Sequence, residues 1–144
     1  MGRRTGMQKG SVMEINWKYK IDLDDSRVFD DIEEQRKTDF PEELRNFITA
    51  HNGASPDKYN FMIGINEKVF GAVLSFNRDE QDADTVYSAF EAISDGKLIP
   101  FAIDPFGNYI CYETSDKQIV FWEHETGKYL NTELSLSEFL ASLY

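Results

Sequence analysis

The chain has 144 residues, of which 15 are Lys or Arg and 26 are Asp or Glu, so its formal net charge at pH 7 is −11. This length fits one domain, and a hydrophobic fraction of 41% excludes an intrinsically disordered chain. The negative charge repels phosphate, which argues against binding to nucleic acid or to an anionic membrane and favours a basic partner.

The N-terminal residues differ from the rest in composition. Residues 1–12 hold three of the basic residues and no apolar segment, so we expect a flexible tail there and a single domain over residues 13–144. No apolar run approaches the roughly 18 residues of a membrane helix. The single cysteine, Cys111, allows no internal disulfide, which favours a cytoplasmic protein. Residues 21–144 carry 10 basic and 25 acidic residues, so the predicted domain is more acidic than the whole chain.

The first half of the domain begins with a strand pattern and continues with two helix patterns. Apolar and polar residues alternate over residues 15–23, which predicts a half-buried strand. A capping signal and apolar residues at helical spacing predict a helix over residues 26–37. Pro41 suits the first turn of a second helix, and Asn52-Gly53 is a left-handed stop that ends it.

Strand patterns dominate from residue 60 onward. Residues 60–65 and 69–76 are apolar, and Gly64 and Gly71 within them suggest bulges or a close approach of another backbone. An acidic loop follows over residues 78–84.

The C-terminal part alternates between strands, turns and helices. A helix is predicted over residues 85–94, and strands over residues 98–103, 109–113 and 118–125. Residues 104–108 have turn chemistry. Ser135 and Glu138 have the spacing of a capping box, and an amphipathic helix closes the chain. With no repeat and no linker, these elements predict one α+β domain.

Motifs for catalysis and for cofactor binding are absent from the sequence. There is no dinucleotide-binding or phosphate-binding glycine motif, and no Cys-x-x-Cys pair. Asp82 and Asp84 do not complete a calcium-binding loop. We therefore expect no cofactor, no metal site and no enzymatic activity.

Two catalytic alternatives can still be formulated. Cys111 and His124 could act as nucleophile and base, but the aromatic neighbours of Cys111 favour a small buried hydrophobe. His124 follows Trp122 on a strand with two apolar faces, where a core tryptophan and a hydrogen-bonded structural histidine are expected. An acid–base pair among the carboxylates of the C-terminal half would need one desolvated member. The candidates for such a pair are Asp104, Glu113, Glu123 and Glu125.

Acidic residues gather in three stretches, at residues 22–25, 30–34 and 79–84. Each stretch alone is explained as a solvated face of the molecule, but together the three stretches create a negative electrostatic field that steers basic partners. The turn at residues 104–108 has two interpretations. Either Asp104 accepts local backbone hydrogen bonds in a hairpin turn, or the turn is a rigid loop presented to a partner.

An ordered set of short motifs resembles the SUKH superfamily, which contains the fungal cell-wall-synthesis regulator and many bacterial immunity proteins. The set covers about residues 26–144, and the strand expected at residues 15–23 precedes it. Asn52-Gly53-Ala54 stands where the family has Asn-Gly-Gly, and Trp122-Glu123-His124 stands where it has Trp-Asp-His. The motifs are Phe40-Pro41, His51-Asn52-Gly53, Ser75-Phe76-Asn77, Ile99-Pro100-Phe101-Ala102, Asp104 with Gly107-Asn108, Cys111 and Phe121-Trp122-Glu123-His124-Glu125.

The resemblance implies an α+β domain with an antiparallel, twisted sheet and flanking helices, and no catalytic residue carries over. It also implies that most bacterial members neutralise a toxin, often a nuclease. Together with the charge, this predicts an immunity protein whose acidic surface covers a basic toxin domain. A regulatory module with an endogenous partner and a small carboxylate-based hydrolase remain alternatives, and the sequence does not set the oligomeric state. The predicted partner-binding residues are Asp79, Glu80, Asp82, Asp84, Asp104, Glu123 and Glu125.

Overall fold

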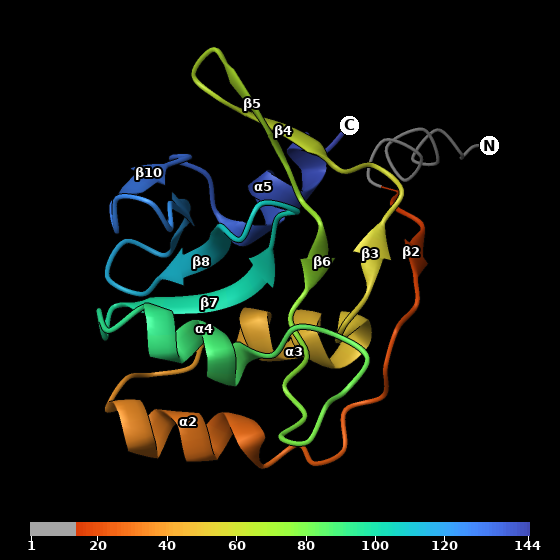
Figure 1. The fold of residues 1–144 in the computed structure, drawn as a ribbon, viewed down its shortest axis with the longest axis vertical. Helices are drawn as coiled ribbons and strands as arrows, with labels where there is room; N and C mark the ends of the chain where they lie inside the picture. The colour runs from red at the N-terminus through yellow and green to blue at the C-terminus, as the bar shows by residue number, and fades with distance from the viewer. Residues whose placement is uncertain (1–13) are drawn as a thin grey trace, which may run out of the picture.

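The computed structural model describes residues 14–144, and the tail predicted over residues 1–12 lies outside the described residues. A five-stranded antiparallel sheet in the order β10-β9-β8-β7-β6 forms the centre of the fold (Figure 1). Its strands are β6 (Ala72–Val73), β7 (Leu98–Ile103), β8 (Tyr109–Glu113), β9 (Gln118–Trp122) and β10 (Tyr129–Asn131). The α+β prediction is therefore confirmed.

Four helices and two small sheets surround this sheet within residues 14–144. The helices are α2 (Val28–Arg36), α3 (Glu42–His51), α4 (Val86–Ala92) and α5 (Leu136–Ser142). One small sheet pairs β2 (Trp17–Lys18) with β3 (Ser55–Pro56), and the other pairs β4 (Asn60–Ile63) with β5 (Asn66–Val69). The β4–β5 hairpin projects from one end of the molecule (Figure 1).

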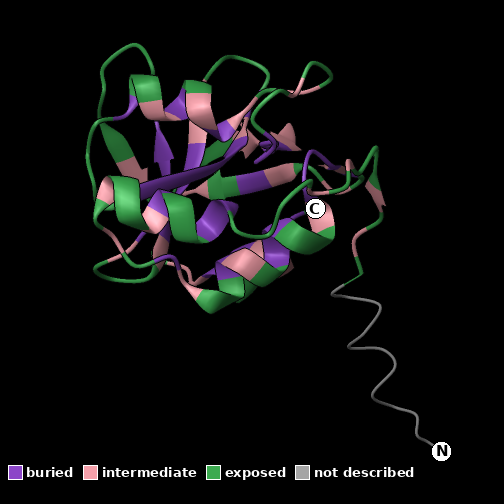
Figure 2. Ribbon diagram, turned by 90° about the horizontal axis from the view of Figure 1, so that it is seen from below, coloured by how far each residue is buried: buried purple, intermediate pink, exposed green. Residues whose placement is uncertain are grey.

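The core occupies both faces of the five-stranded sheet. Inward-facing residues of α2, α3 and α5 pack with one face in a large cluster that includes Phe101 and Phe121. A smaller cluster on the other face contains Cys111, Val120 and Trp122. Buried residues accordingly follow the strands and the inner sides of the helices, while the loops are exposed (Figure 2). The prediction that the strand around Trp122 is covered on both faces is confirmed for Gln118–Trp122.

Local signals place α3, α4 and α5 where the sequence predicts them, whereas the capping signal predicted for α2 is wrong, because α2 begins with no side-chain cap. The Thr85 hydroxyl accepts a hydrogen bond from the amide of Ser88 at the start of α4. Ser135 and Glu138 form the predicted capping box at the start of α5. Gly53 has φ +72° just after α3, as the left-handed stop requires.

The strand predicted over residues 15–23 is wrong in its length. Only Trp17–Lys18 pairs with β3, because β3 itself is two residues long and Tyr19 has φ +68°, which breaks the extended path. Residues 14–24 instead form a strap across the core, in which Ile15, Trp17 and Leu23 pack inward. The alternation therefore marks one-sided packing of an extended segment and not a full strand.

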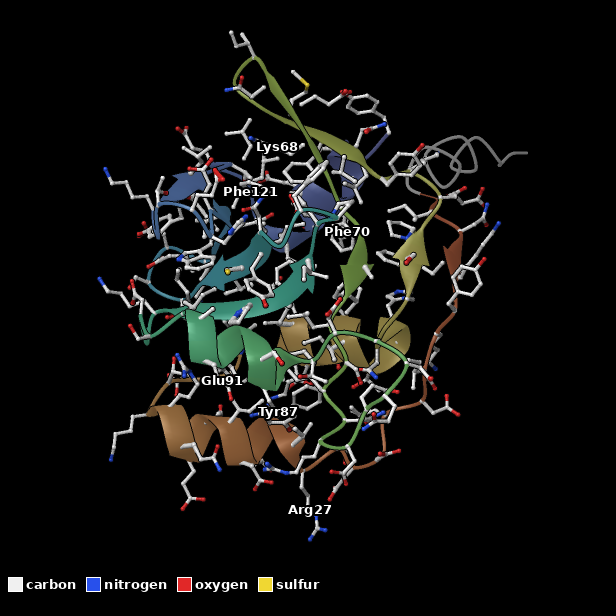
Figure 3. The ribbon with its side chains drawn as sticks, viewed as in Figure 1. Arg27, Lys68, Phe70, Tyr87, Glu91 and Phe121 are labelled. Carbon is white, nitrogen blue, oxygen red and sulfur yellow. The ribbon has the colours of Figure 1, made fainter. Side chains whose placement is uncertain are left out.

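The strand predicted over residues 69–76 is interrupted at Gly71, between β5 and β6. A Cβ on Gly71 would lie 2.6 Å from the carbonyl oxygen of Ile103, so the predicted close backbone approach is confirmed there. Gly64 lies in the turn of the β4–β5 hairpin with φ +60° and not at a bulge. The hairpin is attached to the body on one side, where the Lys68 ammonium lies 5.0 Å from the Phe121 ring centroid (Figure 3).

The strand predicted over residues 118–125 ends at Trp122, and a turn leads to β10, which the sequence pattern does not predict. β10 has only three residues, and its exposed side chains carry no strong strand signal. Of the helices within residues 14–144, none combines the length and the apolar content needed to cross a membrane.

Candidate functional site

The ion pairs among the described residues are confined to the N-terminal part of the chain. All ion pairs among residues 14–144 fall between Lys20 and Arg78. Residues 79–144 hold 13 acidic residues and only three basic ones, Lys97, Lys117 and Lys128. None of these 16 side chains forms an ion pair within the described residues, so the negative charge of this half is not neutralised internally.

The acidic loop, residues 78–84, contains four of the predicted partner-binding residues. Asp79, Asp82 and Asp84 are exposed. Glu80 instead turns inward, where its Oε1 accepts hydrogen bonds from Ser75 Oγ at 2.9 Å and Asn77 Nδ2 at 3.2 Å. Glu80 therefore holds the loop together, while its three neighbours face solvent.

The pKa of Glu80 reflects this inward position. Burial alone would raise the pKa, but the hydrogen bonds from Ser75, Asn77 and the backbone amides of Asp82 and Gln81 stabilise the carboxylate and lower it. Glu80 is thus held in its charged form at neutral pH by partners within its own loop. Its direct contact with another protein remains a prediction.

A buried polar network joins the acidic loop to two distant segments. Asn77 Oδ1 accepts from the amide of Asp24, and Asn77 Nδ2 donates to the carbonyl of Asp22. Asn52, at the end of α3, donates to Ser75 Oγ and accepts from the amide of Phe76. Because Asn52 and Ser75 are fully buried, these bonds fix the loop relative to the strap and to α3.

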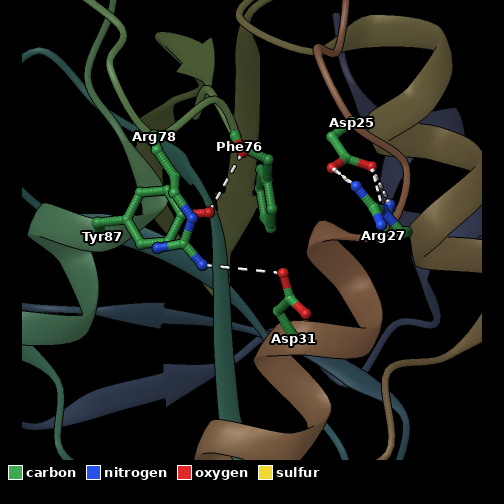
Figure 4. Close-up of polar contacts among 6 residues, drawn as sticks. All are labelled: Asp25, Arg27, Asp31, Phe76, Arg78 and Tyr87. Carbon is green, nitrogen blue, oxygen red and sulfur yellow. Dashed lines mark hydrogen bonds and ion pairs between the residues drawn. The ribbon is translucent and has the colours of Figure 1, made fainter.

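A second set of contacts surrounds the start of the loop, as Figure 4 shows. The Arg78 guanidinium lies 5.1 Å from the ring centroid of Tyr87 and 3.9 Å from Asp31 Oδ2. The hydroxyl of Tyr87 donates to the carbonyl of Phe76 at 3.4 Å, and burial raises the pKa of that tyrosine. Asp25, nearby, is paired with Arg27. These contacts leave Asp79 as the first carboxylate of the loop without an internal partner.

The turn at residues 104–108 is organised by Asp104. This residue is only 6% exposed, and its Oδ1 accepts from the backbone amides of Phe106 and Asn108, both at 2.8 Å. Its Oδ2 accepts from Asn108 Nδ2 at 2.9 Å. The carboxylate is therefore occupied inside the turn, as the hairpin-turn interpretation expects. The turn exposes one large hydrophobic side chain, that of Phe106, which is 71% exposed.

Glu123 and Glu125 lie in the next turn, beside the first one. Asn108 Oδ1 accepts a hydrogen bond from the backbone amide of His124 at 3.0 Å, which ties the two turns together. Glu123 is half-buried and Glu125 is exposed. The prediction of a hydrogen-bonded structural side chain at His124 is wrong, because that side chain is exposed and forms no hydrogen bond within the described residues; only the backbone amide of His124 is bonded.

The predicted residues thus fall into two groups, of which the acidic loop also contains Asp84. Asp104, Glu123 and Glu125 occupy the two joined turns, whereas Asp79, Glu80 and Asp82 occupy the acidic loop. Burial and, after it, the charge of Asp84 raise the pKa of Tyr109, the first residue of β8.

Within residues 79–144, three exposed carboxylates lie outside the acidic stretches and were not predicted. They are isolated in the sequence, and their side chains form no hydrogen bond or ion pair within residues 14–144. Glu91 is an exposed residue of α4 (labelled in Figure 3), Asp116 is in the β8–β9 turn, and Glu133 follows β10. No local sequence signal separates such residues from ordinary surface charges.

The structure also describes the alternatives that involve catalysis. Cys111 is fully buried, and burial, with the charge of Asp95, raises the pKa of its thiol. The two buried carboxylates, Asp104 and Glu113, stand at opposite ends of β8, and each accepts backbone hydrogen bonds in its own turn. Among residues 14–144, no group of three His, Cys, Asp or Glu residues is placed to hold a metal ion.

A hollow with a volume of about 950 Å³ is lined by side chains of both charges. It lies between the α2–α3 connection, the β8–β9 turn and the loop before β7. On its wall the hydroxyl of Tyr112 donates to Glu43 Oε2 at 2.6 Å. Burial and that hydrogen bond raise the pKa of Tyr112, so its hydroxyl remains protonated at neutral pH.

An antiparallel sheet with α3 ending at Asn52-Gly53 and an Asp104-centred turn before β8 is the architecture that the SUKH resemblance implies. The family model of the SMI1 / KNR4 family (SUKH-1) matches residues 25–142, and the chain belongs to this family. The family includes toxin immunity proteins as well as SMI1/KNR4 regulators. A search of the curated proteins found no match. The strap precedes the matched range.

Proposed function

We propose that this protein is an immunity protein that binds a basic toxin domain, a nuclease, in the cytoplasm and covers its substrate-binding surface. The observation that carries the proposal is the excess of 13 acidic over three basic residues in residues 79–144, with no ion pair among them within the described residues. A nuclease is basic where it grips phosphates. An acidic surface that occupies this region competes directly with the nucleic acid.

The geometry favours capture of a cationic surface. Within the described residues no ion pair involves the three exposed carboxylates of the acidic loop, Asp79, Asp82 and Asp84. A Lys or Arg side chain of a partner can therefore pair with each of them without breaking an existing ion pair. Opposite charges raise association rates from a neutral range of about 10⁵–10⁶ M⁻¹s⁻¹ to as much as about 10⁸–10⁹ M⁻¹s⁻¹ at low salt. The buried network behind the loop holds these carboxylates in place before binding, which reduces the entropy lost on association.

This mode of action is binding without chemistry. The full burial of Cys111 and the separation of Asp104 from Glu113 by the length of β8 support that part of the proposal. A tightly bound acidic protein needs no turnover to protect a cell, since occlusion of the toxin is sufficient.

Co-expression with the protein encoded by the adjacent gene tests the proposal, with rescue of growth and formation of a stable complex as readouts. The triple variant Asp79→Asn, Asp82→Asn and Asp84→Asn should slow association and flatten its dependence on salt. A matched control neutralises three exposed carboxylates elsewhere, in Glu34→Gln, Asp39→Asn and Glu42→Gln. At physiological salt the Debye length is about 8 Å, so distant charges contribute little. Unchanged protection and salt dependence in the first variant would show that the acidic loop is not the interface.

The second candidate is a regulatory module with an endogenous partner, which the family's SMI1/KNR4 regulators favour. It predicts that the protein forms a stable complex with a host protein in cells that lack the adjacent gene. It also predicts no rescue of growth in the co-expression experiment, so the two functions give opposite results.

A further inference from the structure

A row of aromatic side chains crosses the end of the sheet next to the two joined turns. Trp122 in β9 is paired in register with Tyr109 in β8 on one side and with Tyr129 in β10 on the other. Paired residues of antiparallel strands point to the same face of a sheet, so the three side chains form one aromatic row. The rings of Tyr109 and Trp122 are 5.9 Å apart between centroids.

The aromatic row becomes more exposed toward the edge of the sheet. Trp122 is 9% exposed, Tyr109 is half-buried and Tyr129 is 43% exposed. β10 is an edge strand, so no further strand of the described residues covers Tyr129. The row thus presents a supported aromatic surface and not a set of isolated side chains.

Phe106 is an exposed aromatic residue in the turn that leads into Tyr109, the first residue of β8. It is 71% exposed, yet its backbone amide is fixed by the buried carboxylate of Asp104. The same carboxylate binds Asn108, which in turn binds the backbone of the turn at Glu123–Gly127. A large apolar side chain held in water by a rigid, internally satisfied turn costs little further entropy when a partner covers it.

The charges around the aromatic surface indicate the chemistry of that partner. Glu123 follows Trp122 directly in the chain, and Glu125 lies two residues further on. Neither carboxylate forms an ion pair within the described residues. The turn at residues 123–127 contains no Lys or Arg, and Lys128 directly follows it. An aromatic centre with an acidic border complements a surface on which arginine side chains stand beside apolar ones, since guanidinium groups stack on aromatic rings and pair with carboxylates.

We propose that Phe106 and the aromatic row form the anchoring centre of the interface with a basic, arginine-bearing protein, and that the surrounding carboxylates form its rim. This inference rests on the proposed function, because the partner is the same basic toxin domain. Asp104 is then a positioning residue that acts through Phe106. The division of roles follows the general pattern in which central aromatic residues set the dissociation rate and peripheral charges set the association rate.

Binding kinetics can separate the centre from the rim. The probe is the protein encoded by the adjacent gene, carrying an inactivating substitution so that it can be purified, and kinetics are measured over a series of salt concentrations. Phe106→Ala and Tyr129→Ala should each raise the dissociation rate constant, roughly thirtyfold for Phe106, with an unchanged salt dependence of association. The acidic-loop triple variant should show the reverse pattern.

Two control variants test whether the effect is specific to this surface. Tyr19→Ala removes an aromatic side chain that is 79% exposed on the strap, beyond the opposite edge of the sheet. Ile65→Ser alters the tip of the β4–β5 hairpin, where Ile65 is 92% exposed. Neither should change the dissociation rate by more than about twofold, because neither residue contributes to the proposed centre. Thermal unfolding confirms that all variants are folded.

The outcomes distinguish this inference from the proposed function. Unchanged dissociation rates in both Phe106→Ala and Tyr129→Ala, together with an effect of the acidic-loop variant, overturn the aromatic centre and leave the immunity function standing. A large effect at Ile65 in place of Phe106 also overturns it, since the hairpin would then be the anchor. No binding and no rescue by the wild-type protein refute the proposed function and this inference together.

Discussion

Replacing Asn52 with Ala should destabilise the protein by about 3 kcal/mol, because this fully buried amide joins three segments of the chain. Its Oδ1 accepts from the amide of Phe76 at 2.8 Å, and its Nδ2 donates to the carbonyl of Ile21 at 3.1 Å and to Ser75 Oγ at 3.2 Å. Leaving the buried amide of Phe76 without a partner costs about 1–3 kcal/mol. Loss of the two other hydrogen bonds adds roughly 1 kcal/mol, since Ser75 keeps its bond to Glu80 and Ile21 is partly exposed.

Urea denaturation followed by circular dichroism measures this change in the free energy of unfolding, and the midpoint of thermal unfolding should fall by about 10 °C. Asn66→Ala is the matched control, because Asn66 is exposed in β5 and its side chain forms no hydrogen bond within the described residues. The control should change stability by less than about 0.5 kcal/mol. An Asn52→Ala variant as stable as the control would refute the view that this network holds the strap, α3 and the acidic loop together.

Three further predictions follow from single positions. Gly53→Ala should lower the free energy of unfolding, measured by urea denaturation, more than Gly64→Ala does. Both glycines have positive φ, but only at Gly53 would the new Cβ meet a side chain, at 2.9 Å from Ile21 Cδ1. Equal losses of stability in the two variants would contradict this reasoning. Cys111 should react with a thiol reagent at pH 8 only after denaturation, because burial raises the pKa of its thiol and blocks access, and rapid labelling of the native protein would contradict the buried position. His51 stacks on Trp17 at 4.5 Å, and burial, with the charge of Lys20, lowers its pKa below the ordinary 6.5. The unfolded chain therefore binds the proton more readily, so the contribution of His51 to stability is complete above pH 6.5 and is lost as the pH falls through the folded-state pKa. An NMR titration of His51 with a midpoint at or above 6.5 would contradict this reasoning.

The sequence alone determines features that depend on neighbouring residues. The helices follow from apolar spacing and from caps such as Ser135 with Glu138, and the turn at residues 104–108 follows from Asp104, Gly107 and Asn108. These signals act over a few residues, so they are readable without a fold. The net acidity and the order of the SUKH motifs are likewise properties of the chain itself, and they are sufficient to indicate the family.

The tertiary structure decides which carboxylates accept hydrogen bonds within the protein and which are available to a partner. Asp79 and Glu80 are adjacent in one acidic run, yet Glu80 is occupied by Ser75 and Asn77 while Asp79 faces solvent. Asp104 is occupied in the same way inside its own turn. A charge count cannot distinguish these cases, because the availability of a carboxylate depends on the donors that the fold brings to it.

Packing across strands likewise creates features that no local pattern contains. Tyr109, Trp122 and Tyr129 form one row only through the register of three strands. The strap has the alternation of a strand, but the two-residue β3 gives it almost no edge to pair with. Composition and local spacing therefore determine the class of this protein and the negative sign of its net charge. The positions of its unpaired charges and exposed aromatic side chains depend instead on contacts between residues distant in the chain.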